Sequence, residues 1–227
     1  MPIFADRTEA GRRLAAVLVD AHYADPVVLA LPRGGIPVAV EIAEALDAPL
    51  DLLPVVKIGV PGDPELAAGA IVGGTEPEVV WNRRVLRSVG LTPPGLRDRL
   101  AAARSELVRR EALYLAGRAR VPVAGRTAIV VDDGLATGTS ARAALRALRA
   151  RHPARIVLAV PLAPADTLEA LKPEADEIVC LARPDPFYGV GTHYVDFRQV
   201  EDREVETLLA DFARTRAHAE PRKASAE

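Results

Sequence analysis

The amino-acid sequence predicts an α/β protein, because short apolar runs rich in β-branched residues alternate with segments of helical periodicity. The chain has 227 residues, which is enough for one sizeable core and predicts a single domain over residues 1–227. Its apolar and charged fractions, 49% and 26%, are those of an ordinary globular protein. Two glycine-containing polar segments directly follow apolar runs, and parallel sheets bind ligands beyond the carboxyl ends of their strands.

The first predicted helix covers residues 8–22, where apolar residues recur at helical spacing after a capping-box-like pair, Asp6 and Glu9. Thr92 and Pro93 open a long helix that ends near residue 116. Further helices are expected at residues 36–46, 140–149, 166–171 and 202–215. Strands are expected at residues 27–31, 50–56, 70–72, 78–81, 127–131, 155–160 and 177–181.

Three segments stand apart from this alternation. Residues 60–69 are dense in proline and glycine and predict a loop. Residues 76–125 are interpreted as a helical insertion that either leans over the site or builds an oligomer interface. The polar, alanine-rich residues 217–227 predict a disordered tail.

Bulk properties exclude several classes of protein. The net charge is −2 and the charges are mixed along the chain, so nothing favours binding to nucleic acid or to a membrane surface. Apolar runs are too short to span a bilayer, and the first residues do not resemble a secretory signal, so the cytoplasm is the expected location. Cys180 is the only cysteine, which excludes an internal disulfide and a cysteine-based metal cluster.

The most informative segment is residues 129–141, in which a buried strand runs into two carboxylates and then a small-residue loop. Because a helix is expected to follow, the unpaired N–H groups of its first turn attract phosphate. Glycines let the loop fold around an anion, and hydroxyl side chains add hydrogen-bond donors. The adjacent Asp132 and Asp133 suit a ribose, since carboxylates accept hydrogen bonds from a diol and stabilise positive charge at the anomeric carbon.

Other interpretations of this segment are less consistent with its residues. The loop contains no lysine, so it is not the P-loop of a nucleotide kinase or hydrolase, and no dinucleotide fingerprint is present. The simplest alternative is an ordinary strand-to-helix turn with a capping hydroxyl and two solvated acids.

Residues 129–141 resemble the 5-phosphoribosyl-1-pyrophosphate (PRPP) signature of the type I phosphoribosyltransferases. The resemblance implies a twisted, mostly parallel sheet flanked by helices, with a small C-terminal hood at residues 183–200. It also implies a Mg²⁺-bound PRPP substrate, whose 5-phosphoribosyl group passes to a nitrogen nucleophile with loss of pyrophosphate, and a homodimer. Asp132 and Asp133 would be the catalytic and metal-binding acids. The 5-phosphate would bind to Ala136, Thr137, Gly138, Thr139 and Ser140.

A second strand-turn-helix segment supports the resemblance. The run at residues 27–31 leads into Arg33 and two glycines, and Arg33 offers a planar charged fork to phosphate oxygens while Gly34 allows the backbone to approach an anion. In the family this position binds pyrophosphate, and Lys57, at the end of the next apolar run, is a further candidate. The alternatives are glycines that serve packing, a solvated arginine and a surface lysine.

Two further assignments are weaker. Glu65 is a candidate catalytic residue in a loop that would close over the ribose, although an ordinary surface acid is the simpler interpretation. Phe187 or Tyr188 would hold the acceptor in the hood, unless both rings only pack the last strand. Ala136 stands where 6-oxopurine members of the family have an acid, which leaves the acceptor open. A PRPP-sensing regulatory protein without transferase activity is the alternative function.

Overall fold

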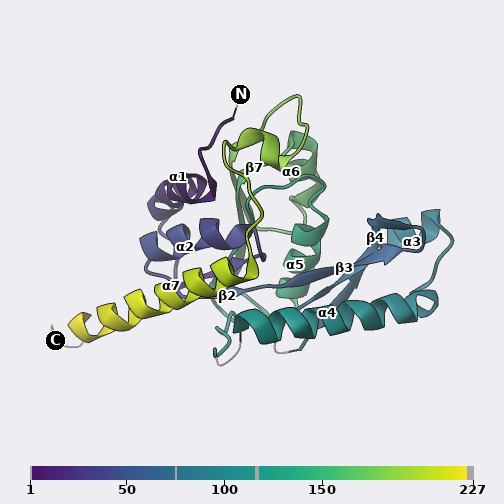
Figure 1. The fold of residues 1–227 in the computed structure, drawn as a ribbon, viewed down its shortest axis with the longest axis horizontal. Coiled ribbons are helices and arrows are strands. Elements are labelled where there is room, and N and C mark those ends of the chain that lie inside the picture. The colour runs from purple at the N-terminus through teal and green to yellow at the C-terminus, as the bar shows by residue number, and fades with distance from the viewer. Residues whose placement is uncertain (1, 75, 116–117, 224–227) are drawn as a thin grey trace.

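The computed structural model describes residues 2–74, 76–115 and 118–223, without the side chains of residues 64, 65 and 217–223. Its centre is a parallel sheet with helices packed around it (Figure 1). The five strands of this sheet have the order β2-β1-β6-β7-β8. These strands are β1 (Pro26–Ala30), β2 (Leu50–Leu52), β6 (Thr127–Val131), β7 (Arg155–Leu162) and β8 (Glu177–Ala182). The topology confirms the predicted α/β fold with a mostly parallel sheet.

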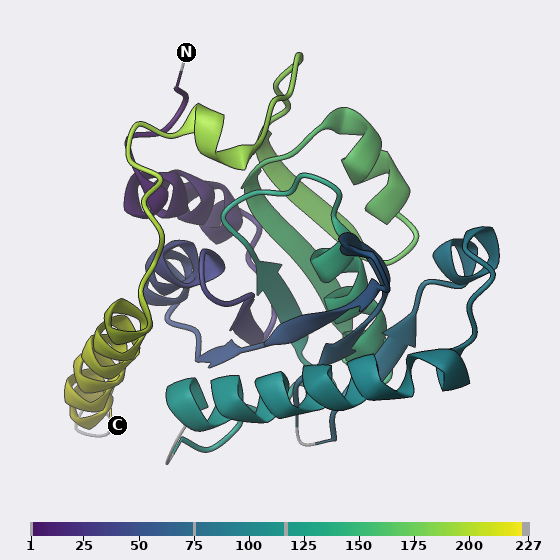
Figure 2. The same cartoon turned by 45° about the vertical axis from the view of Figure 1, so that its right-hand side comes forward.

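Helices cover both faces of this sheet (Figure 2). They are α1 (Arg7–Asp20), α2 (Gly35–Ala45), α5 (Thr139–Arg149) and α6 (Ala165–Leu171). Every residue of β6 is buried, as expected for a central strand. Ile129 and Val131 pack in the core formed with α1 and α2, whereas Ala128 and Val130 pack in the core formed with α5 and α6. The residues that follow β6 therefore emerge between two helical layers.

A second, antiparallel sheet consists of β3 (Val55–Val60), β4 (Asp63–Val72) and β5 (Glu78–Trp81). The prediction of one strand over residues 50–56 is wrong, because this segment is divided between the two sheets. Leu53 donates its N–H to the carbonyl of Ala30 (2.9 Å), and the next residue, Pro54, has no N–H to continue the ladder. The predicted loop at residues 60–69 is also corrected: only Pro61 and Gly62 form a turn, and β4 pairs with β3 directly after them.

The segment 76–125 contains one strand as well as helices. Besides β5 it holds α3 (Arg83–Ser88), the short 3-10 helix η1 (Pro93–Leu96) and α4 (Arg97–Leu115). The long helix α4 lies along the antiparallel sheet (Figure 2), where Ala103 and Leu107 pack against Ile58 and Ile71. Its C-terminal end approaches the parallel sheet, and Tyr114 belongs to the core that includes α2.

The segment 183–200, predicted as a hood, contains the 3-10 helix η2 (Val190–His193) and packs on the beginning of the chain. Ile3 and Phe4 donate their N–H groups to the carbonyl of His193 (2.7 and 3.1 Å), and Val195 donates to the carbonyl of Phe4 (2.9 Å). The N-terminus and the hood are therefore one structural unit.

The final helix, α7 (Asp202–Lys223), extends past residue 217, where the sequence predicted a disordered tail. Ala217, Ala219 and Glu220 are good helix formers, which favours this continuation up to Pro221. The last four predicted tail residues, 224–227, lie outside the described part of the chain. Among the described helices, none is both long and apolar enough to cross a bilayer.

Candidate functional site

The signature loop, residues 134–140, connects β6 to α5. The residues predicted to hold the 5-phosphate lie together at the start of that helix: Ala136, Thr137, Gly138, Thr139 and Ser140. Gly138 has φ +66°, a left-handed conformation that L side chains rarely adopt, and it precedes the first helical residue. The hydroxyl oxygens of Thr137 and Thr139 are 3.1 Å apart. This arrangement of N–H groups and hydroxyls at a helix N-terminus can bind an anion.

The two acids after β6 have different surroundings. Asp132 accepts a hydrogen bond from the N–H of Asp133 (2.9 Å) and makes no ion pair with any described residue. Asp133 is paired with Arg7 through Nε and Oδ2 at 2.7 Å, and these side chains are only 13% and 11% exposed. Burial, and then the charge of Asp133, raise the pKa of Asp132 well above its usual value. Burial also raises the pKa of Asp133, although the Arg7 guanidinium opposes that rise.

Arg7 is a site residue that the sequence did not indicate. It opens α1, far from the signature loop in sequence, and no recognisable pattern links it to Asp133. Its guanidinium lies 3.9 Å from the ring centroid of Phe197 and donates to the carbonyl of Arg198 (2.9 Å). The hydroxyl of Tyr194 donates to the carbonyl oxygen of Asp133 (2.6 Å). The first helix and the hood therefore hold Asp133 together.

The turn that carries Arg33 lies directly against the acids. An added Cβ on Gly34 would fall 2.1 Å from Oδ2 of Asp133, and one on Gly35 would fall 2.6 Å from the carbonyl oxygen of Val131. The two glycines thus let this turn pack against the end of β6. The structure brings together the two loops that the sequence singled out.

Arg33 is held by Asp202, a second residue that the sequence did not indicate. Its Nη1 is 3.1 Å from Oδ1 of Asp202, the first residue of α7, and both side chains are about one-third exposed (33% and 38%). The hydroxyl of Tyr114 donates to the same carboxylate oxygen. Hydrogen bonds from Tyr114 and Arg33 lower the pKa of Asp202, while burial, and then Asp202, raise the pKa of Tyr114 to about 12. An acid in a first helical turn usually indicates only a helix start, so the sequence alone does not link Asp202 to this site.

Lys57 and Glu65, the two remaining predicted site residues, are less closely connected to Arg33 and the acids. Lys57 is exposed on β3 and makes no hydrogen bond or ion pair with any described residue. Glu65 lies in β4, but its side chain is outside the described part of the structure. No hydrogen bond or ion pair among the described residues joins either of them to Arg33 or to the acids.

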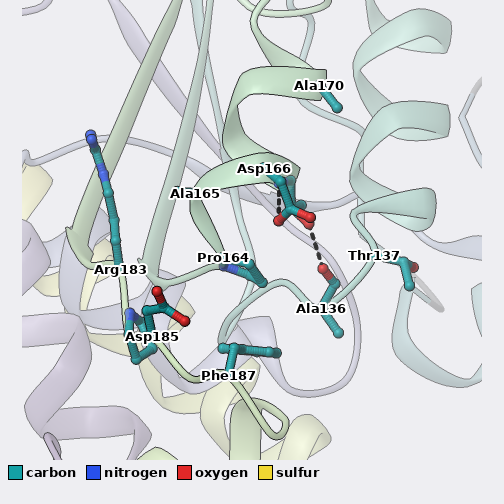
Figure 3. Close-up of a pocket in the computed structure, with 11 residues that line it drawn as sticks. Ala136, Thr137, Pro164, Ala165, Asp166, Ala170, Arg183, Asp185 and Phe187 are labelled. Atoms are coloured by element: carbon teal, nitrogen blue, oxygen red, sulfur yellow. Dashed lines mark hydrogen bonds between the residues drawn. The ribbon is translucent and has the colours of Figure 1, made fainter.

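A cavity of about 680 Å³ opens beside the signature loop (Figure 3). Ala136 and Thr137 lie on one side of it, the hood residues lie on the other, and Pro164 and Asp166 lie between them. Thr167 ties the start of α6 to the loop by donating its hydroxyl to the carbonyl of Ala136 (2.7 Å). The hood contributes Arg183, Pro184, Asp185 and Phe187.

The structure distinguishes the two aromatic candidates of the hood. Phe187 lines the cavity and stacks on His193, with ring centroids 5.6 Å apart. Tyr188 is 82% exposed and does not line the cavity. Asp166 and Asp185, which the sequence did not single out, place two carboxylates on the same walls.

The comparison with known proteins decides the family. The model of the phosphoribosyl transferase domain matches residues 6–196, which include both loops, the acids and most of the hood. The chain belongs to the phosphoribosyl transferase domain family.

The chain is also similar to two individual proteins. Over 209 residues, or 92% of the chain, it is 46% identical to a protein of Mycobacterium tuberculosis (strains CDC 1551 / Oshkosh and ATCC 25618 / H37Rv) that is provisionally named a phosphoribosyl transferase. The chain spans about half, 47%, of the length of these relatives. It is also 40% identical to the protein TT1426 of Thermus thermophilus, whose crystal structure matches with a TM-score of 0.81 over 93% of this chain and 99% of that one.

Proposed function

We propose that this phosphoribosyl transferase domain transfers the 5-phosphoribosyl group of PRPP to a nitrogen nucleophile and releases pyrophosphate. The observation that carries the proposal is the packing of Gly34 against the carboxylate of Asp133. It joins the turn of Arg33 to the acids of the signature loop, so that two loops suited to phosphate flank one acid pair. This arrangement fits a ribose that carries phosphate groups at both ends.

In the proposed reaction, the bond between C1 of the ribose and the pyrophosphate oxygen breaks, and its electron pair leaves with pyrophosphate. The lone pair of the acceptor nitrogen forms the new C1–N bond, and the nitrogen then releases a proton to water. Positive charge develops on the ribose as the first bond breaks. The carboxylates of Asp132 and Asp133 would stabilise this charge, and the loops would supply orientation.

We propose that Mg²⁺ binds together with PRPP. No group of three or more acidic, histidine or cysteine side chains gathers at one point in the described part of the chain, so the protein alone offers no complete metal cage there. Mg²⁺ commonly binds one or two carboxylates together with substrate phosphates. The unpaired carboxylate of Asp132 fits that role, and the ion would neutralise charge on the leaving pyrophosphate.

The cavity beside the signature loop is the proposed acceptor site. Phe187 offers an aromatic face for stacking, and Asp166 and Asp185 can accept hydrogen bonds from N–H groups. Ala136 adds no charge to the wall. These side chains suit a nucleobase or a related amine.

Pyrophosphate release tests this function. The protein is incubated with PRPP, Mg²⁺ and a panel of nucleobases and amines, and products are identified by mass spectrometry. We expect release that requires one class of acceptor and yields a phosphoribosylated product, and the double variant Asp132→Asn/Asp133→Asn should lose it while circular dichroism stays unchanged. PRPP binding without release across the panel would support the sensor instead, and absence of PRPP binding would contradict both functions.

A further inference from the structure

A second cavity, of about 580 Å³, lies on the other flank of the signature loop. Its walls come from β4, β5, the start of α3 and one side of α5. It shares no lining residue with the first cavity, the proposed acceptor site that Phe187 lines. Thr139 lies on its wall, whereas Thr137 lines the other cavity. The volume is within the range of small-molecule sites, about 300–1,000 Å³.

Positive charge dominates this cavity. Among the described residues, its lining has no acidic side chain and four arginines, Arg83, Arg84, Arg142 and Arg146. Arg146 is neutralised by Glu174, with Nε 2.9 Å from Oε1. Arg142 donates only to a main-chain carbonyl, and Arg83 and Arg84 make no hydrogen bond or ion pair with any described residue. Three arginines therefore line one cavity without a carboxylate partner among the described residues.

The sequence that follows Trp81 has the same bias. Residues 83–104 contain six arginines and a single acid, Asp98, in a chain whose net charge is −2. Such a local excess of arginine attracts phosphate groups, and the planar guanidinium matches their oxygens.

The cavity also contains the only tryptophan of the chain, Trp81. Its indole lies against Gly69, where an added Cβ would come within 2.9 Å of the ring atom Cε3. This packing fixes the ring, which is half-buried and lines the cavity. A fixed indole beside arginines can stack on a base while the guanidinium groups bind phosphates.

We propose that this cavity is a binding site for a nucleoside polyphosphate, which adjoins the proposed PRPP site at Thr139. The phosphates contact Arg83, Arg84 and Arg142, and the base lies on Trp81. The proposal does not depend on transferase activity, since it rests on a different cavity. A bound ligand would touch Thr139 and thereby the signature loop.

The experiment titrates the full chain with ATP and follows the fluorescence of Trp81, with calorimetry on the same samples. We expect a saturable change, and weaker binding of inorganic tripolyphosphate by about tenfold, because it has no base to stack. Arg84→Gln/Arg142→Gln should weaken ATP binding by about tenfold or more. The matched control Arg87→Gln/Arg104→Gln removes the same charge outside the cavity lining and should change it less than about twofold.

Four outcomes would overturn the proposal. They are the absence of saturable binding, equal losses in the two double variants, equal affinity for tripolyphosphate and ATP, and displacement of ATP by PRPP. Equal losses would indicate diffuse attraction of polyanions such as nucleic acid, and displacement would assign the signal to the signature loop. Circular dichroism of each variant confirms that lost binding does not reflect lost folding.

Discussion

At the scale of single residues, Asp132 and Asp133 are unequal although they are adjacent in sequence. Asp133 is an ion-paired part of the framework, held by Arg7 and packed on Gly34. Asp132 is desolvated without an ion pair, so its charge is costly until a cation arrives. This difference makes Asp132 the acid best prepared to meet Mg²⁺ or the developing charge on a ribose.

The raised pKa of Asp132 predicts a specific dependence of stability on pH. An acid whose pKa is higher in the folded state contributes stability at low pH, which is lost as pH rises from its usual value through the raised one. We therefore expect Asp132→Asn to be more stable than the wild type at pH 7, by about 1 kcal/mol or more, with the difference shrinking towards pH 4. Urea unfolding across this pH range measures it, and a difference independent of pH would contradict the prediction.

Gly34→Ala tests the contact between the two loops. Because the new Cβ would overlap Oδ2 of Asp133, the turn or the acid must move, at a cost of about 1–3 kcal/mol. We expect loss of PRPP binding by calorimetry together with this destabilisation. Gly95→Ala is the control, since its Cβ would meet only Oγ1 of Thr92 at 3.7 Å. Equal PRPP affinity in the wild type and Gly34→Ala would separate the turn of Arg33 from the substrate site.

At the scale of elements, α4 and α7 converge on the turn of Arg33. Tyr114, near the end of α4, and Asp202, at the start of α7, form one hydrogen-bonded group with that arginine. Asp202 thus already accepts a hydrogen bond from the guanidinium that is proposed to bind pyrophosphate. The long helix of the insertion therefore reaches the site through a single tyrosine hydroxyl.

Asp202→Asn is expected to bind Mg²⁺-pyrophosphate more tightly, because the substitution removes a carboxylate that competes for Arg33. The groups are partly exposed, so the gain should be modest, up to about fivefold by calorimetry. Glu206→Gln, which removes the same charge from an exposed position of α7, should leave the affinity unchanged. Weaker binding by Asp202→Asn would show instead that Asp202 positions Arg33 for its ligand.

At the scale of the whole molecule, local patterns predicted most of the fold and singled out the two loops that the structure brings together. β6 and β5 have the predicted bounds, because a mostly apolar run and a short β-branched run leave few alternatives. Contacts between residues far apart in the chain could not be predicted from local sequence patterns. The ion pair of Arg7 with Asp133 spans 126 residues, and that of Arg33 with Asp202 spans 169. The division of residues 50–56 at Pro54 could not be predicted either, because it depends on which of the two sheets each half of this segment joins.

The proposed site draws on α1, two loops and the hood, so a ligand that binds there stabilises the molecule as a whole. A ligand bound only by the folded state at 100 times its Kd adds about 2.7 kcal/mol to the free energy of unfolding. For a chain of 227 residues this corresponds to a rise in Tm of about 5–10 °C.

We expect Mg²⁺-PRPP to produce this rise in differential scanning calorimetry, and Mg²⁺ with ribose 5-phosphate to produce a smaller one, because it lacks the pyrophosphate that Arg33 would hold. The double variant Asp132→Asn/Asp133→Asn should show little increase with either ligand. Equal rises with PRPP and ribose 5-phosphate would remove the turn of Arg33 from the site and leave only the signature loop.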